Sequence, residues 1–127
     1  MEKKIILKGR ELDVMKVLWK ENETLNASDI AKKGSLSINT VQAALKKLLA
    51  NKYIRVADIG YSGTVLSRKY VAVISADAFI YDNFLEFSDL KSSLKIFAAL
   101  IDEETDENTI SELEDIIKEK KIKLKME

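Results

Sequence analysis

Apolar residues recur between Ser35 and Lys52 with a helical spacing, and no Pro or Gly interrupts them. A period of about 3.6 residues places them in one stripe along a helix, on the side expected to face a core. Ser37 precedes this run, and its hydroxyl can accept a backbone N–H of the first turn, so we expect it to be the N-cap. The pattern predicts a helix from Ile38 to about Asn51, with an apolar stripe formed by Leu36, Val41, Ala44, Leu45, Leu48 and Leu49.

The opposite face of this predicted helix is small and amide-rich near its start and cationic further along. Amide side chains can pair with base edges in the major groove of DNA. Lysine side chains can contact phosphates, which position a protein without reading the base sequence. An ordinary solvated helix face has a similar composition, so the surrounding pattern has to decide between the two interpretations. The face consists of Asn39, Thr40, Gln42, Ala43, Lys46 and Lys47.

Two further helices are predicted before this one. The first runs from Arg10 to Glu21, and a shorter one follows from Ala27 to Lys33. Asn26 suits the N-cap of the short helix, and Gly34 suits its C-terminal cap. A helix, a short helix, a tight turn and a longer helix form the layout of a helix-turn-helix, in which the second helix of the pair enters the major groove.

Two β-prone runs follow, Tyr53–Ala57 and Thr64–Ile74, joined by the glycine-containing turn Ile59–Gly63. Two such runs joined through glycine predict a hairpin, and a hairpin in this position is the wing of a winged helix. The alternative is a hairpin that only closes the core, because its tip lacks the cation that a minor groove attracts. We include among the expected DNA contacts Asn26, Arg55 and Arg68.

The chain after Ser75 predicts three short amphipathic helices: Ala76 to about Phe87, Asp89–Ile101, and one capped by Thr105. Helices this short make a poor independent core, so we expect them to bury their apolar faces against a second copy. The alternative is that they fold back onto the winged helix in a monomer. The residues expected in the dimer interface are Phe79, Phe84, Phe87, Leu94, Phe97, Ile101, Leu113 and Ile117.

The expected fold is therefore mainly α with a small β hairpin. A winged-helix DNA-binding domain would occupy residues 1–74 and a helical dimerisation domain residues 75–127. Charge divides in the same way, because residues 1–74 hold 14 Lys and Arg against 7 Asp and Glu, and residues 75–127 hold 7 against 14. The formal net charge of zero conceals this division. A basic half joined to an acidic half favours a polyanion-binding module attached to something else.

Composition restricts the chemistry that the chain can perform. The chain has no Cys and no His, which excludes disulfides, thiolate metal sites and the commonest acid–base residue. We expect no cofactor, no metal and no enzymatic activity, and we interpret carboxylates such as Glu11, Asp13 and Asp102–Glu104 as helix-face and loop charges. No apolar run approaches the roughly 18 residues of a membrane span, and the N-terminus lacks a signal-peptide core. We therefore expect a cytoplasmic protein without a membrane partner.

Two motifs are similar to those of a known family. The first predicted helix contains E-x-x-V-M-K-V-L-W from Glu11 to Trp19, and the third contains T-V-x-x-x-L-x-x-L from Thr40 to Leu48. With the acidic segment Ile110–Ile117, they make residues 7–118 resemble the penicillinase-repressor family, BlaI, MecI and CopY. The resemblance implies homodimeric winged-helix repressors that bind palindromic operators of resistance or stress genes. It also implies that the groove-facing residues are Ser37, Asn39, Thr40, Gln42, Ala43 and Lys46.

The chain departs from this family in three respects. Gln42 stands where members often have Lys or Arg, which changes the expected operator. The Asn-Phe bond cleaved in the beta-lactam-responsive members has no counterpart in the predicted fifth helix, since Asn83-Phe84 falls in the fourth. The copper-responsive members use C-terminal cysteines, and this chain has none.

Other functions stay open at this point. A winged helix can bind another polypeptide, and the sign of that would be an apolar patch around the third helix in place of a basic groove. A regulator with a small-molecule pocket is a further alternative, although plain dimer core explains the same aromatic set. The residues that would line such a pocket are Phe79, Phe84, Phe87 and Phe97.

Overall fold

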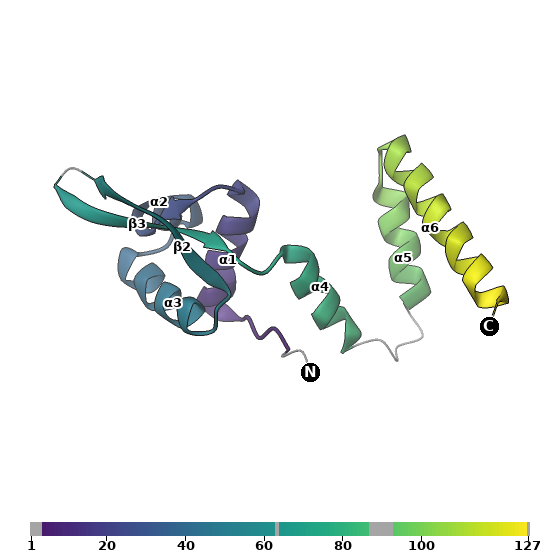
Figure 1. The fold of residues 1–127 in the computed structure, drawn as a ribbon, viewed down its shortest axis with the longest axis horizontal. Coiled ribbons are helices and arrows are strands. Elements are labelled where there is room, and N and C mark those ends of the chain that lie inside the picture. Colours follow the sequence, from purple (N-terminus) through teal and green to yellow (C-terminus); the bar gives the residue numbers. More distant parts are fainter. Residues whose placement is uncertain (1–3, 63, 87–92, 127) are drawn as a thin grey trace. The chain divides into compact units, whose positions relative to one another are not determined.

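A computed structural model describes residues 4–62, 64–86 and 93–126 (Figure 1). The chain forms two compact units, Met1–Glu86 and Phe87–Glu127. The elements are, in order, α1 (Gly9–Glu21), β1 (Leu25–Asn26), α2 (Ala27–Gly34), α3 (Ile38–Ala50), β2 (Ile54–Ser62), β3 (Val65–Ala72), α4 (Ala76–Leu85), α5 (Ser93–Glu103) and α6 (Glu107–Lys125). The first unit is a winged helix-turn-helix, as the sequence predicts, and the second consists of helices.

The core of the first unit lies where α1, α2, α3 and the sheet meet. The predicted stripe of α3 is confirmed, because Val41, Ala44, Leu45 and Leu48 are buried. Leu36 and Leu49 are partly buried against the same core. Burying apolar surface in this way is the main force that holds the three helices together. The buried residues are Leu7, Val14, Met15, Leu18, Leu25, Ile30, Val41, Ala44, Leu45, Leu48 and Ile54.

The N-terminal caps of α2 and α3 agree with the sequence. Ser37 Oγ accepts the backbone N–H of Thr40 at 3.1 Å. Asn26 Oδ1 accepts the N–H of Asp29 at 2.8 Å, while Asp29 Oδ2 accepts the N–H of Asn26 at 3.4 Å, which completes a capping box. The starts of α2 and α3 are therefore fixed by side chains as well as by packing.

The end of α2 differs from the expectation. Gly34 is still helical, and the left-handed cap residue is Ser35, with φ 53°. A Cβ at position 34 would lie 3.0 Å from Val17 Cγ2, which is closer than most carbon atoms pack. Glycine therefore favours the close approach of α2 to α1 here, and it is not used for a left-handed backbone.

The sheet has three antiparallel strands in the order β1-β3-β2. The short strand β1 pairs with β3 through Leu25 opposite Tyr70 and Asn26 opposite Lys69. The hairpin is longer than predicted, because Ile59 and Gly60 pair with β3 where a turn was expected. The ladder extends to Ser62 and Val65, since the β-prone residues of β3 supply partners along its whole length. Figure 1 shows this hairpin projecting beyond the helices as a wing.

Helix α4 packs on the first unit, although we expected it to begin the second domain. The Trp19 and Phe79 rings lie 5.7 Å apart between centroids, and Trp19 Nε1 donates to the Ile74 carbonyl at 2.9 Å. These contacts join the beginning of α4 to α1. The packing therefore divides the chain after Glu86, whereas charge and pattern suggested a division after residue 74.

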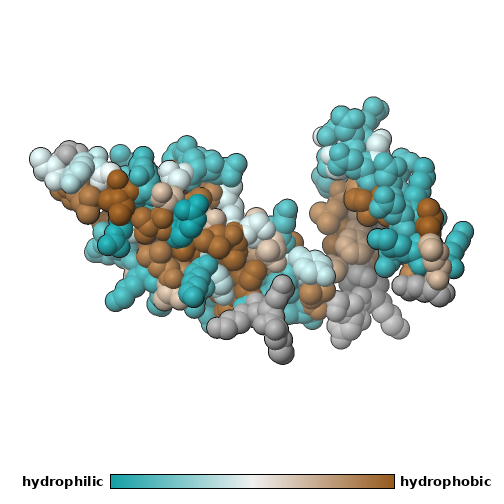
Figure 2. Space-filling model, viewed as in Figure 1, coloured by the Kyte–Doolittle hydropathy of each residue, from teal (hydrophilic) through white to brown (hydrophobic). Residues whose placement is uncertain are grey.

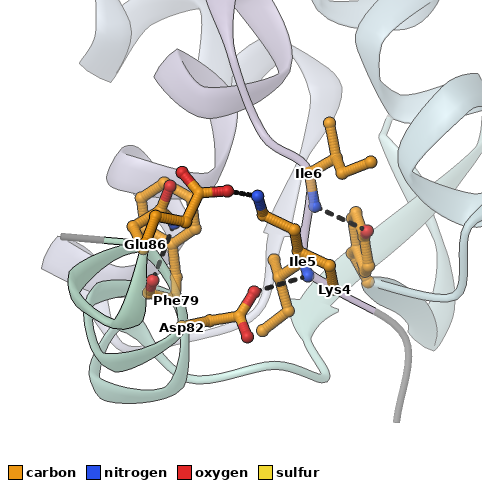
Figure 3. A network of polar contacts seen from close by, with 8 residues as sticks. Lys4, Ile5, Ile6, Phe79, Asp82 and Glu86 are labelled. Atoms are coloured by element: carbon orange, nitrogen blue, oxygen red, sulfur yellow. Dashed lines mark hydrogen bonds and ion pairs between the residues drawn. The ribbon is translucent and has the colours of Figure 1, made fainter. Parts of the chain in front are cut away.

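The N-terminal segment strengthens this attachment of α4 (Figure 3). The backbone N–H of Ile5 donates to Asp82 Oδ2 at 2.9 Å, and Lys4 forms an ion pair with Glu86. The next N–H, of Ile6, donates to the Tyr53 hydroxyl at 3.0 Å. The segment thus connects α4 to Tyr53, the residue just before β2.

The second unit contains α5 and α6, and none of its described residues is buried. Helix α6 begins after Asp106, whose carboxylate accepts the N–H of Asn108 at 3.1 Å and the Thr109 hydroxyl at 3.0 Å. Asp106 therefore occupies the N-cap position that we expected for Thr105, because its carboxylate reaches the first turn. Of the fifth helix, the expected residues 89–92 lie outside the described part of the chain.

The residues expected in a dimer interface fall in both units. Phe79 packs against Trp19 inside the first unit, and Phe84 is half-buried. Leu113 is half-buried in α6, and Phe87 lies outside the described residues. Figure 2 shows apolar surface gathered over α5. The remaining four are exposed: Leu94, Phe97, Ile101 and Ile117.

No helix in the described part of the chain is both long and apolar enough to cross a membrane.

Candidate nucleic-acid interface

The polar face of α3 points to solvent because the opposite stripe is held in the core. Asn39, Gln42, Ala43, Lys46 and Lys47 are exposed, as the sequence predicts. Thr40 is half-buried, next to the exposed N-cap Ser37. The helix therefore presents amides near its N-terminus and ammonium groups about one to two turns further on.

A groove of about 770 Å³ runs between this face, the start of α2 and strand β3. It brings together four of the predicted DNA contacts, which come from three different elements: Asn26, Gln42, Lys46 and Arg68. The remaining lining residues are Ala27, Ser28, Ile38, Leu45, Leu49, Val65, Leu66, Ser67 and Tyr70. The fold thus converts residues up to 42 positions apart in sequence, from Asn26 to Arg68, into one concave surface.

Charge in the groove is positive. Lys46 and Arg68 both line it, and neither makes an ion pair with any described residue. The described residues that line the groove include no carboxylate. Two cations without a neighbouring carboxylate create a field that attracts an anionic ligand such as a phosphate backbone.

Lys47 lies outside this groove, although we predicted that it would contact DNA beside Lys46. Its Nζ lies 3.9 Å from Glu11 Oε1 of α1. One residue along a helix rotates the side chain by about 100°, which directs Lys47 toward α1 and Lys46 toward the wing. The two lysines are therefore not equivalent.

Arg55 is also separated from the groove. It follows Ile54, which is buried in the core, and neighbouring side chains of a strand point to opposite faces. Arg55 and its partner Val71 therefore lie on the outer face of the sheet. Arg68, which pairs with Ile59, lies on the inner face and lines the groove.

Three predicted contact residues already use polar atoms inside the protein. Ser37 Oγ donates to Thr40 Oγ1 at 2.7 Å, so these two hydroxyls are partly engaged with each other. Asn26 Oδ1 is engaged in the capping box. The side-chain Nδ2 of Asn26 is the donor that this residue can offer to a ligand in the groove.

The wing is more apolar than the sequence suggested. Tyr61 is 76% exposed, and Ile59, Val65 and Leu66 are also exposed. Tyr61 pairs with Leu66, and Ile59 pairs with Arg68, so alternation puts Ile59, Tyr61 and Leu66 on the inner face of the hairpin, together with Arg68. Val65 is next to Leu66 and pairs with Ser62, so it lies on the other face. Figure 2 shows apolar surface along the hairpin. An exposed apolar strip therefore borders the cationic groove.

Sequence reasoning missed several lining residues. Ser28 lies in the first turn of α2, and Ile38 opens α3. Val65 and Leu66 were assigned to the hairpin but not to the groove. The signal for Ser28 was its place two residues after the predicted cap, which directs it to the exposed start of the helix. The positions of Val65 and Leu66 depend on the β2–β3 register, which the sequence pattern does not determine.

A second depression, of about 520 Å³, lies between the end of α1 and the junction of β3 with α4. Its lining includes Trp19, Thr24, Val73 and Ser75, and none of the phenylalanines in the expected small-molecule pocket. Within the described residues, no group of three or more Asp and Glu side chains is arranged to hold a metal ion.

Comparisons with known proteins agree with this architecture. The helix-turn-helix domain family matches residues 25–66, which span β1, α2, α3, β2 and the start of β3. These elements build the groove. No curated protein sequence matches the chain.

The chain is also similar to several solved structures. A MarR family regulator from Neisseria meningitidis is 22% identical over 94% of this chain and 78% of its own, with a TM-score of 0.44. Staphylococcus aureus MarR in complex with salicylate and kanamycin is 14% identical over 96% and 75%, with a TM-score of 0.45. The DNA-binding TubR fragment from Clostridium botulinum is 16% identical over 61% and 94%, with a TM-score of 0.42.

Proposed function

We propose that this protein is a sequence-specific DNA-binding transcriptional repressor that acts as a homodimer on a palindromic operator. The observation that carries the proposal is the groove beside α3. There Gln42, Lys46 and Arg68 lie together, and no carboxylate is present among the described lining residues. A helix that exposes amides and cations over a cationic groove suits double-stranded DNA.

The mechanism that we propose is steric and non-enzymatic. Helix α3 enters the major groove, where the amides of Asn39 and Gln42 pair with base edges. Lys46, Arg68 and the Nδ2 group of Asn26 contact the phosphates beside it. Two subunits place two such helices about 34 Å apart, or a multiple of that distance, along one face of the duplex. The occupied operator is then unavailable to the transcription machinery.

The homodimer is supported by the second unit. Its described apolar side chains are exposed or half-exposed, and two short helices bury too little surface to be stable alone. A second copy supplies an identical apolar surface, and a two-fold axis matches the symmetry of a palindrome.

We further propose that the repressor is of the penicillinase-repressor type and controls resistance or stress genes, acting in the cytoplasm where the DNA lies. The Glu11–Trp19 and Thr40–Leu48 motifs support this relationship. Its release from DNA would differ from that of the known members. Asn83 lies in α4 of the first unit, where its Nδ2 donates to the Phe79 carbonyl at 2.8 Å, and Cys is absent.

A second candidate function is a winged helix that binds another protein. The exposed apolar strip on the wing, formed by Ile59, Tyr61 and Leu66, favours it, because exposed apolar patches mark protein contact sites. The cationic residues of the groove favour DNA. Binding measurements separate the two functions.

The decisive experiment measures binding of the purified protein to the DNA upstream of its own gene, with random duplex as the reference. Fluorescence anisotropy at two salt concentrations gives the affinity and its salt slope. We expect tight, salt-sensitive binding with a preference of about 10³-fold or more for the upstream DNA. Binding to neither duplex at low salt would contradict the DNA function and favour the protein-binding alternative.

Three variants assign roles within the groove. Gln42→Ala should reduce specific binding by about 1–3 kcal/mol while leaving random-duplex binding nearly unchanged. Lys46→Ala should weaken both and flatten the salt slope by about 1. Lys47→Ala is the matched control, because Lys47 lies outside the groove, with its Nζ 3.9 Å from Glu11 Oε1, and should matter less. Equal losses for Lys46→Ala and Lys47→Ala would contradict the groove assignment.

A further inference from the structure

Charge is segregated along α6, the last helix of the chain. Between Glu107 and Ile117 there are four carboxylates and no lysine. Between Lys118 and Lys125 there are five lysines and one carboxylate. The helix has 19 residues and is thus about 28 Å long. One half of it is acidic and the other half is basic.

An apolar stripe crosses both halves. It begins with the half-buried Ile110 and Leu113 and continues through the exposed Ile117 and Leu124. Spacings of three, four and seven residues keep these side chains on one side of the helix. Ile116 and Ile117 lie where the acidic half meets the basic half, at the middle of α6.

We infer that α6 pairs in an antiparallel arrangement with α6 of a second copy, with the two-fold axis close to Ile116 and Ile117. The inference rests on the homodimer of the proposed function and specifies how that homodimer is built. An antiparallel pair joins the two apolar stripes and sets each acidic half beside the basic half of the partner. A parallel pair would place acidic halves together and basic halves together, which is repulsive.

Symmetry gives a simple geometric test of this arrangement. Residues near the axis lie close to their own copies, while residues at the ends lie far from theirs. Asn108 is about eight residues before the middle of α6, so its two copies would be about 25 Å apart at 1.5 Å per residue. It would instead lie near Lys125 of the partner, at the opposite end of the helix.

The chain contains no Cys, so a thiol-specific cross-linker can react only with a cysteine that is introduced by substitution. The variants are Ile116→Cys, Asn108→Cys and Lys125→Cys in the full chain, treated with a short bifunctional maleimide. We expect Ile116→Cys to cross-link to its own copy, and the two end variants not to. The two end variants, Asn108→Cys and Lys125→Cys, are also mixed in equal amounts and left to exchange subunits before the maleimide is added. We expect this mixture to give a cross-link between one Asn108→Cys subunit and one Lys125→Cys subunit.

A second measurement does not depend on cysteine. In the antiparallel dimer, replacing Lys120, Lys121 and Lys123 with Glu sets acidic surfaces against each other. Sedimentation should show a dimer dissociation constant raised by about tenfold or more at low salt, with less difference at high salt. Adding Glu112→Lys, Glu114→Lys and Asp115→Lys to the same chain exchanges the two halves and should restore the dimer.

The outcomes separate this inference from the proposed function. Self-cross-linking of Asn108→Cys, or a charge-reversed chain that dimerises like the native one, would overturn the antiparallel arrangement and leave a DNA-binding dimer intact. A native chain that sediments as a monomer would overturn both the arrangement and the homodimer. Antiparallel cross-linking in a protein that binds no DNA would support the arrangement and contradict the proposed repressor.

Discussion

The two units of this chain bury their apolar residues very differently. In the first, Met15, Ile30 and Val41 are completely inaccessible to solvent. In the second, no described residue is buried, and Leu94 is 75% exposed. Similar apolar residue types are present in both, so the difference lies in how many elements surround them. The first unit encloses its own core, whereas the described apolar side chains of the second unit are left at least partly accessible to solvent.

Topology explains why the first unit closes. Its sheet brings β1 and β3 together from distant parts of the chain, and α1 packs on both other helices of the helix-turn-helix. Two consecutive helices such as α5 and α6 can cover only one side of each other. An amphipathic pattern alone therefore does not distinguish a helix that is buried within its own domain from a helix whose apolar face stays exposed.

The largest expected effect comes from removing the second unit. A fragment of residues 1–86 should still unfold cooperatively in urea, because its core and the contacts of α4 are retained. Its affinity for a palindromic operator should fall by about 10²- to 10⁴-fold, since the two half-sites would no longer be held by one dimer. Sedimentation, urea unfolding and anisotropy test these statements. A fragment that is unfolded in water would contradict the self-contained core.

The next effect compares one side chain from each unit. Met15→Ala should lower the free energy of unfolding of the first unit by about 2–5 kcal/mol, because the site is fully buried. Leu94→Ala should leave that unfolding transition unchanged and act only on dimerisation. Tryptophan fluorescence in urea follows the first unit through Trp19, the single tryptophan. Equal destabilisation of that transition by both variants would remove the distinction between the units.

A smaller effect tests whether α4 belongs to the first unit. Trp19→Phe removes the hydrogen bond to the Ile74 carbonyl but keeps an aromatic ring beside Phe79. The expected loss is about 1–2 kcal/mol, because a partly buried acceptor is left without its donor. Circular dichroism in urea measures it. Unchanged stability would mean that the α1–α4 contact contributes little, and that the division after residue 74 describes the energetics better.

The smallest effects probe how tightly the first unit is packed. Gly34→Ala adds a methyl group 3.0 Å from Val17 Cγ2, so it should lose about 0.5–1 kcal/mol despite the better helix propensity of Ala. Ser35→Gly, one residue later, should gain about 0.5 kcal/mol by relieving a left-handed backbone. Thermal unfolding should show a lower melting temperature for Gly34→Ala and a higher one for Ser35→Gly. A stabilising Gly34→Ala would show that α1 and α2 have room to separate.

Much of the first unit was predictable because local signals agree there. Ser37 and Asn26 are predicted to be N-caps, and both occupy that position in the structure. The apolar stripe of α3 is buried, as its helical period indicates. The pairing of Leu25 with Tyr70 was not predictable, since two residues carry no strand pattern. Helix α4 was assigned to the second unit because the charge changes near Ser75. In the structure it belongs to the first unit, because Phe79 and the Ile74 carbonyl contact Trp19.

The candidate site was predictable as a helix face and not as a groove. The helical period of α3 predicts that Gln42, Lys46 and Lys47 are all exposed. It does not predict that Lys47 lies beside Glu11 of α1, because that contact depends on how α1 and α3 pack. The outward position of Arg55 and the inward position of Arg68 follow from the register and the bulge near Ala57. Such long-range pairing depends on tertiary packing, so no local pattern contains it.

Asn26 has consequences for the genetics of this protein. Its backbone pairs with Lys69 of the wing, its side chain caps α2, and the residue lines the groove. If the protein is the proposed repressor, random mutagenesis for loss of repression would therefore recover this codon often, and each allele would combine several defects. Alleles at Gln42 would carry a single defect and could be suppressed by a matching change in the operator. In the proposed repressor, substitutions at Asn26 would alter the wing, the α2 cap and the groove together, whereas substitutions at Gln42 would change the DNA target and leave the fold intact.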